Sequence, residues 1–328
     1  MRANLSICLA AFIVSACGGG GGDSGTGILA GGPLALTSSN YVTAAQETMS
    51  VTFYVDDSGG LVTGAQAGSA PNLLRNVLAN ARQVSHWIKV APQSVTGATT
   101  TASESCSGGG TVNLSINDAN GNGTVDVGDS IRLVALNCVE QAETMNGAMS
   151  VVVSSASGSP SSGGNYSMGM SITLESFTAR SATGVSTGNG RMDFTEAQVG
   201  SVLTTTVQAR SLSVVNNVGN VSSTRSLTDY TVQSVTTTTA GVASVSLSVN
   251  GTFSSTALDG KSLTVATLKP FVSTASSLYP ASGQLQVTGA SGSNLRVTAQ
   301  AANVLIELDA DGNGSFETSI TKPWSQLL

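Results

Sequence analysis

The chain has 328 residues, with 38 glycines, 49 serines and 37 threonines, and only 10% of its residues are charged. Thirteen Lys and Arg against 19 Asp and Glu give a net charge of −6, which excludes the basic surface that a nucleic acid requires. The single histidine excludes His-rich metal sites and most histidine-based relays. Low charge at 40% hydrophobic content argues against disorder, and abundant Ser, Thr and Val favour an all-β protein.

The first 16 residues have the parts of an export signal. Arg2 provides a positive charge, residues 5–14 form an apolar run, and the small Ser15 and Ala16 precede Cys17. This run is shorter than the roughly 20 residues that cross a bilayer, so we expect a secretory signal over residues 1–16 that is removed. Cleavage by an ordinary signal peptidase, without lipid attachment, remains the alternative.

The tetrad Val14–Cys17 resembles the lipobox of bacterial lipoproteins. In that family the cysteine sulfur receives a diacylglycerol, and the new amino terminus is acylated with chains such as palmitate. The resemblance implies that Cys17 is the lipidation site and that the membrane is a partner. Two or three acyl chains anchor stably, because each buried CH₂ contributes about 0.8 kcal/mol. By resemblance to sorting in this family, Gly18 after the cysteine favours the outer membrane, on either of its faces.

The composition after Cys17 suggests a simple domain organisation. Residues 17–35 are rich in glycine and predict a flexible tether behind the lipid. Residues 36–328 show no clear linker and predict a single β-rich domain. A sub-boundary near residue 145 is the second choice.

One segment predicts an amphipathic helix over residues 72–89. Pro71 suits the start of a helix, Pro92 marks its end, and apolar residues recur between them at helical spacing. His86 falls on the polar face of this helix, so we expect an exposed residue and not a catalytic base.

The remaining segments predict strands. Apolar and polar residues alternate with a period of two at residues 51–55, 112–116, 166–175, 244–249, 285–287, 295–297 and 304–308. Strands with one buried and one wet face pair antiparallel. Glycine-containing connectors at residues 146–147, 188–190, 250–251 and 289–292 predict hairpin turns. The predicted fold is therefore mainly all-β, a large antiparallel curved sheet or an open barrel of meandering strands.

Residues 144–150 and 248–254 have related sequences, each with an Asn-Gly pair at its centre. Two related halves of a sheet would explain this echo, and so would a shared hairpin chemistry.

Cys106 and Cys138 are an even pair in a chain that we expect to be exported. Cys8 leaves with the signal and Cys17 takes the lipid. We therefore predict a disulfide between Cys106 and Cys138. A metal-binding or reactive thiol pair is the alternative.

The segment from Asp118 to Asp129 has the spacing of a calcium-binding loop. Oxygen donors stand at positions 1, 3, 5, 7, 9 and 12, namely Asp118, Asn120, Asn122, Thr124 (through its carbonyl), Asp126 and Asp129. Gly123 occupies position 6, where the chain must turn sharply. The loop resembles those of EF-hand and dockerin proteins, which implies calcium as a cofactor. It departs from the EF-hand because position 12 is Asp and because its flanks predict strands.

A second segment follows the same pattern in part. Positions 1, 3, 5 and 9 are Asp309, Asp311, Asn313 and Glu317, but position 12 is Ile320, which offers no ligand. For both segments a plain hairpin turn without metal remains the alternative, because Asp-Gly and Asn-Gly pairs are strong turn signals. If calcium binds, we expect its role to be structural.

As a whole, the chain resembles uncharacterised proteobacterial β-rich envelope lipoproteins. The residues that carry this resemblance are Cys106–Gly110, Asp118–Ser130, Asn137-Cys138, Asn146-Gly147, Tyr279-Pro280, Ser282-Gly283, Asp309–Gly314, Trp324 and Leu327. The resemblance implies location and fold, but no activity.

No constellation of catalytic residues stands out, so we expect a non-enzymatic envelope lipoprotein with a structural or adhesive role and an envelope or surface partner. One alternative is a carrier whose curved sheet encloses a lipid or other apolar ligand near Met168 and Met170. A hydrolase that uses His86 is the least favoured.

Overall fold

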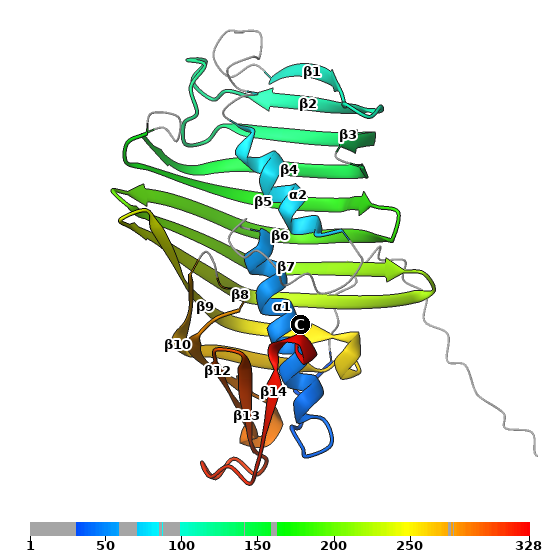
Figure 1. The fold of residues 1–328 in the computed structure, drawn as a ribbon. Helices are drawn as coiled ribbons and strands as arrows, with labels where there is room; N and C mark the ends of the chain where they lie inside the picture. Colours follow the sequence, from blue (N-terminus) through cyan, green and yellow to red (C-terminus); the bar gives the residue numbers. More distant parts are fainter. Residues whose placement is uncertain are drawn as a thin grey trace, which may run out of the picture.

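The computed structural model describes residues 31–58, 71–84, 87, 99–140, 142–158, 163–274, 277 and 279–328. These residues form one antiparallel sheet of 14 strands, with two helices on one face (Figure 1). Every strand pairs with its neighbours in the chain, so β1 and β14 are the two edges of an open sheet. The predicted large antiparallel sheet is confirmed.

The helices are α1 (Tyr41–Ser58) and α2 (Leu73–Arg82), with short 3₁₀ turns η2 (Thr256–Leu258), η3 (Ala290–Gly292) and η4 (Trp324–Gln326). The strands are β1 (Thr99–Ser105), β2 (Thr111–Asn117), β3 (Ser130–Glu140), β4 (Glu143–Ser157), β5 (Tyr166–Arg180), β6 (Gly184–Val199), β7 (Val202–Val218), β8 (Val221–Thr239), β9 (Val242–Ser255), β10 (Ser262–Thr274), β11 (Ser282–Thr288), β12 (Asn294–Gln300), β13 (Asn303–Asp309) and β14 (Thr318–Pro323).

The alternation of residues in the predicted strands sorts side chains onto the two faces of the sheet. On β5, the side chains of Met170, Ile172 and Leu174 are buried on the helix-covered face. Buried apolar side chains from Leu36 to Leu327 belong to one hydrophobic cluster. Strand β4 runs through residue 145 and pairs with both β3 and β5, so the sheet continues across that position.

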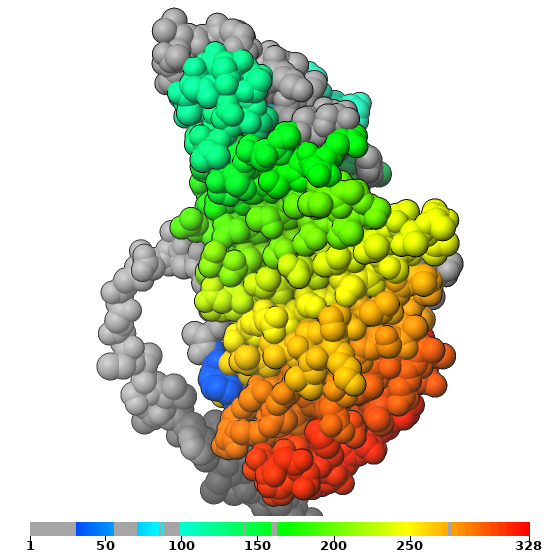
Figure 2. Space-filling view, turned by 90° about the vertical axis from the view of Figure 1, so that its left-hand side faces the viewer, coloured from blue at the N-terminus to red at the C-terminus, as the bar shows by residue number. Residues whose placement is uncertain are grey.

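The face that carries no helix is a broad surface of successive strands. In Figure 2, which views the molecule from the side, the strands follow one another in chain order as adjoining bands. Arg132 and Glu175 form an ion pair on this face, with 2.7 Å between nitrogen and oxygen. This solvent-exposed face, with serine, threonine and scattered ion pairs, accounts for much of the Ser and Thr content of the chain.

The prediction of a strand at residues 51–55 is wrong, because these residues lie in α1. The alternation of Val51, Phe53 and Val55 has another cause: the helix is buried on most of its surface, and the intervening Thr52 is fully buried as well. Thr48 and Thr52 satisfy their hydroxyls within the helix by donating to the carbonyls four residues earlier, at 2.7 and 2.8 Å. A helix without a wet face does not show the amphipathic period that would have identified it.

Helix α1 is attached to the sheet by polar and aromatic contacts. The Arg225 guanidinium lies 2.7 Å from the Glu47 carboxylate, which also accepts a hydrogen bond from Ser255. Phe53 meets Trp324 edge to face, with ring centroids 6.0 Å apart. These contacts join α1 to β8, to β9 and to the C-terminal turn.

The helix predicted at residues 72–89 is confirmed as α2 over Leu73–Arg82. Asn72 caps its start by accepting a hydrogen bond from the backbone of Arg75 at 3.2 Å. Its predicted apolar residues Leu73, Leu74, Val77, Leu78 and Ala81 are buried. The regular helix ends at Arg82, although the Trp87 N–H still donates to the Gln83 carbonyl at 3.0 Å. His86 lies outside the described residues.

Three of the predicted hairpin turns lie inside strands. Residues 146–147 belong to β4, residues 188–190 to β6 and residues 250–251 to β9, whereas residues 289–292 do connect β11 with β12. The registers of β4, β6 and β9 with their neighbours shift at these positions, because two residues of the neighbouring strand stand opposite one residue here, so the neighbouring strand carries the β-bulge. The sequence signal was misread because a bulge and a tight hairpin both require a positive φ.

Gly147 and Gly251 show what these bulges require. Their φ angles are 97° and 136°, and a Cβ atom at either position would collide with the backbone of the neighbouring strand, at Ser176 and at Tyr230. This explains the echo between residues 144–150 and 248–254, since in both segments the glycine faces a bulge of the neighbouring strand. Bulges increase local twist, and the strands change direction from β1–β8 to the steeper β12–β14 (Figure 1).

Residues 31–36 lie against the sheet. The Leu34 N–H donates to the Ser262 carbonyl at 2.9 Å, and the Leu34 carbonyl accepts from Ala290 at 2.7 Å. The last part of the predicted tether, residues 31–35, is therefore attached to the folded body. Cys17 and the rest of the N-terminal segment lie outside the described residues. No described helix is long and apolar enough to span a membrane.

Candidate functional site

The two Asp/Asn/Gly segments form hairpin loops near opposite edges of the sheet. Residues 118–129 connect β2 with β3, beside the edge strand β1. Residues 310–317 connect β13 with the edge strand β14. We name them the first loop (residues 118–129) and the second loop (residues 309–317).

The first loop is organised around two carboxylates. The two oxygens of Asp118 each accept a backbone N–H, from Gly121 and from Gly123, both at 2.7 Å. Asp129 is fully buried at the other end and accepts from the backbone of Ala119 at 2.9 Å and of Asp126 at 2.7 Å. The loop thus closes upon itself through backbone N–H groups.

A third carboxylate gathers the polar side chains of the first loop. One oxygen of Asp126 accepts from the amides of Asn120 and Asn122 at 2.9 and 2.7 Å and from the hydroxyl of Thr124 at 3.1 Å. These hydrogen bonds stabilise the charged form and lower the pKa of Asp126 below its ordinary value of 3.8, with Asn120 first among the causes. Three of the side chains predicted as calcium ligands, those of Asn120, Asn122 and Asp126, therefore lie together.

The second loop repeats the turn with fewer residues. Asp309 is buried, and its carboxylate accepts from the backbones of Gly312, Asn313 and Gly314 at 2.8, 3.1 and 2.9 Å. Glu317 accepts from the backbone of Ala310 at 2.8 Å, just as Asp129 accepts from Ala119 in the first loop.

The second loop also brings its acids closest together. Asp309, Asp311 and Glu317 each place an oxygen within 4.8 Å of the other two. Among the described residues, the three acids of the first loop do not form such a group.

Both loops offer the hard oxygens that calcium prefers, from carboxylates and amides. In the first loop the amides of Asn120 and Asn122 donate to Asp126, so each would have to turn to present its oxygen to a cation. In the second loop Asp309, Asp311 and Glu317 already lie together and would hold the ion, whereas Asn313, whose amide donates to Asp311 at 2.9 Å, would have to turn to add its oxygen. A bound ion would neutralise these carboxylates and tie the two strands of each hairpin together.

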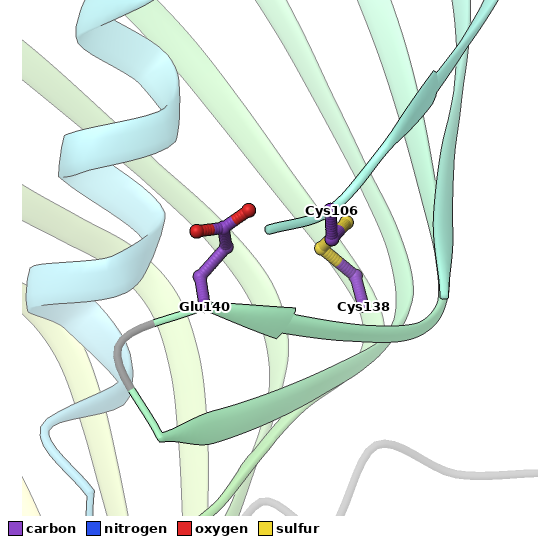
Figure 3. A group of neighbouring side chains, drawn as sticks. All are labelled: Cys106, Cys138 and Glu140. Atoms are coloured by element: carbon purple, nitrogen blue, oxygen red, sulfur yellow. A yellow bond between two sulfur atoms is a disulfide. The ribbon is translucent and has the colours of Figure 1, made fainter. Parts of the chain in front are cut away.

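The disulfide predicted between Cys106 and Cys138 is confirmed, with 5.4 Å between the Cα atoms. It ties the end of β1 to β3, across the strand between them. Glu140 lies beside it (Figure 3), within 4.8 Å of both sulfurs. Because the sulfurs are bonded to each other, these three residues do not form a thiolate metal site, and the alternative of a free thiol pair is wrong.

A groove that we did not expect from the sequence lies beside this disulfide. A hollow of about 480 Å³ lies between α2 and the first strands of the sheet. The helix side presents Asn72, Arg75, Asn76, Asn80, Gln83 and Trp87. The strand side presents Glu104, Glu140, Glu143 and Met145. The helical spacing of Asn72, Asn76, Asn80 and Gln83 is the signal in the sequence that could have revealed the polar wall.

The face around Met168 and Met170 is not an open apolar hollow. Met170 is fully buried, and α2 packs on β5 and β6 beside it. A Cβ atom at Gly188 would collide with the Leu73 side chain, which shows how closely the helix approaches the sheet.

The three comparisons with known proteins found no match, so the function has to be inferred from the residues described above. No protein-family model matches the chain, and no curated protein or solved structure matches it either.

Proposed function

We propose that the protein is a non-enzymatic lipoprotein of the bacterial cell envelope, anchored in the outer membrane through Cys17. The observation that carries this proposal is the Cys106–Cys138 disulfide. Disulfides are typical of exported proteins, and this one uses both cysteines downstream of the tetrad Val14–Cys17. Of the cysteines after the predicted signal, this pairing leaves Cys17 for lipidation, in the position that lipidation requires.

The proposed role is structural or adhesive, with an envelope or surface partner and with calcium as a stabilising ion. Exposed sheet edges are prone to pair with other chains, and proteins protect them. The two candidate calcium loops belong to the hairpins next to β1 and β14. Calcium at both loops would stiffen the two ends of an open sheet in the ion-containing space outside the cytoplasm.

The alternative of a carrier for a lipid or other apolar ligand has less support. Its expected binding face near Met170 is covered by α2, and the large groove beside the disulfide has a polar lining. An apolar ligand there would leave amides and carboxylates without hydrogen-bond partners.

Replacement of the lipidated cysteine tests the anchor. Cys17→Ser, expressed in a Gram-negative host, should move the protein from the membrane fraction to the soluble periplasmic fraction and abolish labelling with radioactive palmitate. The matched control is Cys8→Ser, which changes a cysteine inside the signal and should leave both readouts intact. Membrane retention of Cys17→Ser, with unchanged palmitate labelling, would contradict the proposal.

A further inference from the structure

The groove between α2 and strands β1–β4 has the size of a small-molecule site. Its volume of about 480 Å³ lies within the range of about 300–1,000 Å³ that ligand pockets occupy. We propose that this groove binds a neutral polyhydroxylated ligand, a saccharide.

The helix wall of the groove is rich in amides. Asn76, Asn80 and Gln83 all line it, and an amide carries both a donating NH₂ and an accepting oxygen. The NH₂ of Asn80 already donates to the Asn76 carbonyl at 2.9 Å and to the Met145 sulfur at 3.8 Å, so Asn80 offers a ligand its oxygen. Asn76 donates to the Glu143 carboxylate at 2.5 Å, which joins the two walls at one end.

The strand wall is rich in carboxylates. Glu104, Glu140 and Glu143 line it. Figure 3 shows the Glu140 carboxylate between the disulfide and α2. The side chain and backbone of Ser107 donate to Glu140 and lower its pKa, so this group is charged at neutral pH and accepts hydrogen bonds.

The two walls together decide the class of ligand. An anion would be repelled by three carboxylates that face a single guanidinium, Arg75. An ammonium ion only donates, so it would match the carboxylates but would offer no acceptor to the NH₂ of Gln83 or to the second N–H of Asn76, whose first N–H donates to Glu143. A hydroxyl both donates and accepts, so a ligand with several hydroxyls matches both walls at once.

The groove also has apolar surface where the C–H groups of a sugar ring would lie. Trp87 and Met145 contribute to the lining from the two walls, and Val112 lies beside the disulfide. Carbohydrate rings combine polar edges with apolar faces, and a lining that combines amides, carboxylates and an aromatic ring is complementary to both.

This inference stands apart from the anchor and the loops. The groove contains neither Cys17 nor any residue of the two candidate calcium loops. A failure of the groove to bind sugar would therefore leave the proposed lipoprotein intact, and a soluble Cys17→Ser protein is suited to the test.

The test is a binding titration of the purified full chain carrying Cys17→Ser. The probes are glucose, N-acetylglucosamine, cellobiose and chitobiose, with putrescine and dodecanoate as the competing classes, followed by calorimetry and tryptophan fluorescence. We expect at least one sugar to bind and to change the tryptophan emission. Trp87→Phe should abolish that change, because the remaining Trp324 lies in the core away from the groove.

Matched substitutions locate the binding. Asn80→Leu and Glu143→Gln should each raise the dissociation constant of the sugar about tenfold. The controls Asn217→Leu and Glu175→Gln lie outside the groove and should leave it unchanged. Absence of binding by all four sugars, preference for putrescine or dodecanoate, or equal effects of groove and control variants would overturn the proposal. Thermal unfolding of every variant establishes that the comparison is made on folded protein.

Discussion

The first and second loops make the same turn with different lengths of chain. In each, the leading aspartate accepts N–H groups from two glycines, Gly121 and Gly123 or Gly312 and Gly314. In each, a closing carboxylate accepts the N–H of the alanine that follows that aspartate. The closing residue is at position 12 in the first loop and at position 9 in the second.

This difference shows that the turn is closed by a hydrogen bond and not by a fixed count of residues. The 12-residue template ranks the first loop above the second, because the second has Ile320 where a ligand is expected. In the structure, however, the second loop ranks above the first in how closely its carboxylates lie, since oxygens of Asp309, Asp311 and Glu317 lie within 4.8 Å of one another. Pairing of the backbones of Glu317 and Leu308, at 2.9 Å, brings the closing acid into place early.

The largest expected effect concerns the disulfide, which brackets only the first loop. The double variant Cys106→Ser, Cys138→Ser should lose about 3–4 kcal/mol of unfolding free energy, because the bond closes a loop of 32 residues. Urea unfolding measures the loss. Hydrogen exchange should accelerate in the first loop and not in the second. Equal acceleration in both loops would show that the two ends of the sheet are not independent.

The next effect compares the leading aspartates. Asp309→Ala should cost about 2–3 kcal/mol, because it removes the acceptor of three backbone N–H groups at a buried position. Asp118→Ala should cost less, about 1–2 kcal/mol, because it leaves two such groups without an acceptor. Asp311→Ala, at an exposed site of the second loop, is the control. Chemical denaturation without calcium measures both losses of unfolding free energy. A larger loss for Asp118→Ala than for Asp309→Ala would refute the comparison.

Calcium affinity should differ between the loops by about tenfold, or about 1.4 kcal/mol, in favour of the second. The reason is that the three carboxylates of the second loop already lie together and only Asn313 must turn there, whereas both Asn120 and Asn122 must turn in the first loop. Native mass spectrometry should show two ions on the wild type and one on Glu317→Gln or Asp126→Asn. Calorimetry of these variants then gives each affinity, with magnesium as the control ion. If calcium bound the first loop more tightly than the second, the 12-residue template would govern affinity.

The smallest effect is the titration of Asp126. Its pKa in the folded protein is lowered. Asp126 therefore contributes to the stability of the fold above the ordinary pKa of 3.8, and this contribution is lost as the pH falls through the lower pKa of the folded state. Asn122→Ala removes one of the hydrogen bonds and should move the pKa back toward 3.8. Carboxyl NMR signals in a pH series report both values. An unchanged pKa in the variant would assign the shift to other groups.

The sequence predicted those elements whose pattern has a single physical cause. Strand β5 was predictable because Met170, Ile172 and Leu174 alternate with polar residues on a sheet that has one wet face. Helix α2 was predictable because its apolar residues share one face. Helix α1 was missed because Val51, Phe53 and Val55 lie on a helix without a wet side.

The site was predictable to a similar extent. The disulfide followed from the number of cysteines, and the loops followed from local spacing. The groove did not, because its walls meet only after Asn76 on α2 and Glu143 on β4 are brought together by folding. The glycines at residues 147 and 251 were recognised as special, but whether a positive φ belongs to a turn or to a bulge depends on the neighbouring strand.

The order of the strands has a consequence for how the protein acquires its structure. Since each strand pairs with its chain neighbours, the sheet can lengthen one hairpin at a time, and its stability builds up from contacts between neighbours. Helix α1 does not share this property. It is synthesised before every strand, yet Gln46 binds the backbone of Gln326 at 2.6 Å and Phe53 packs on Trp324.

Helix α1 therefore cannot complete its packing until the end of the chain has been made. Its contacts with α2 and β8 can form earlier, but those of Phe53 with Trp324 and of α1 with β12 and β13 form only when these last elements have emerged. A chain that stops short of Trp324 would expose this helix while most of the sheet could still form. The C-terminal turn thus makes completion of the whole chain a condition for covering its beginning.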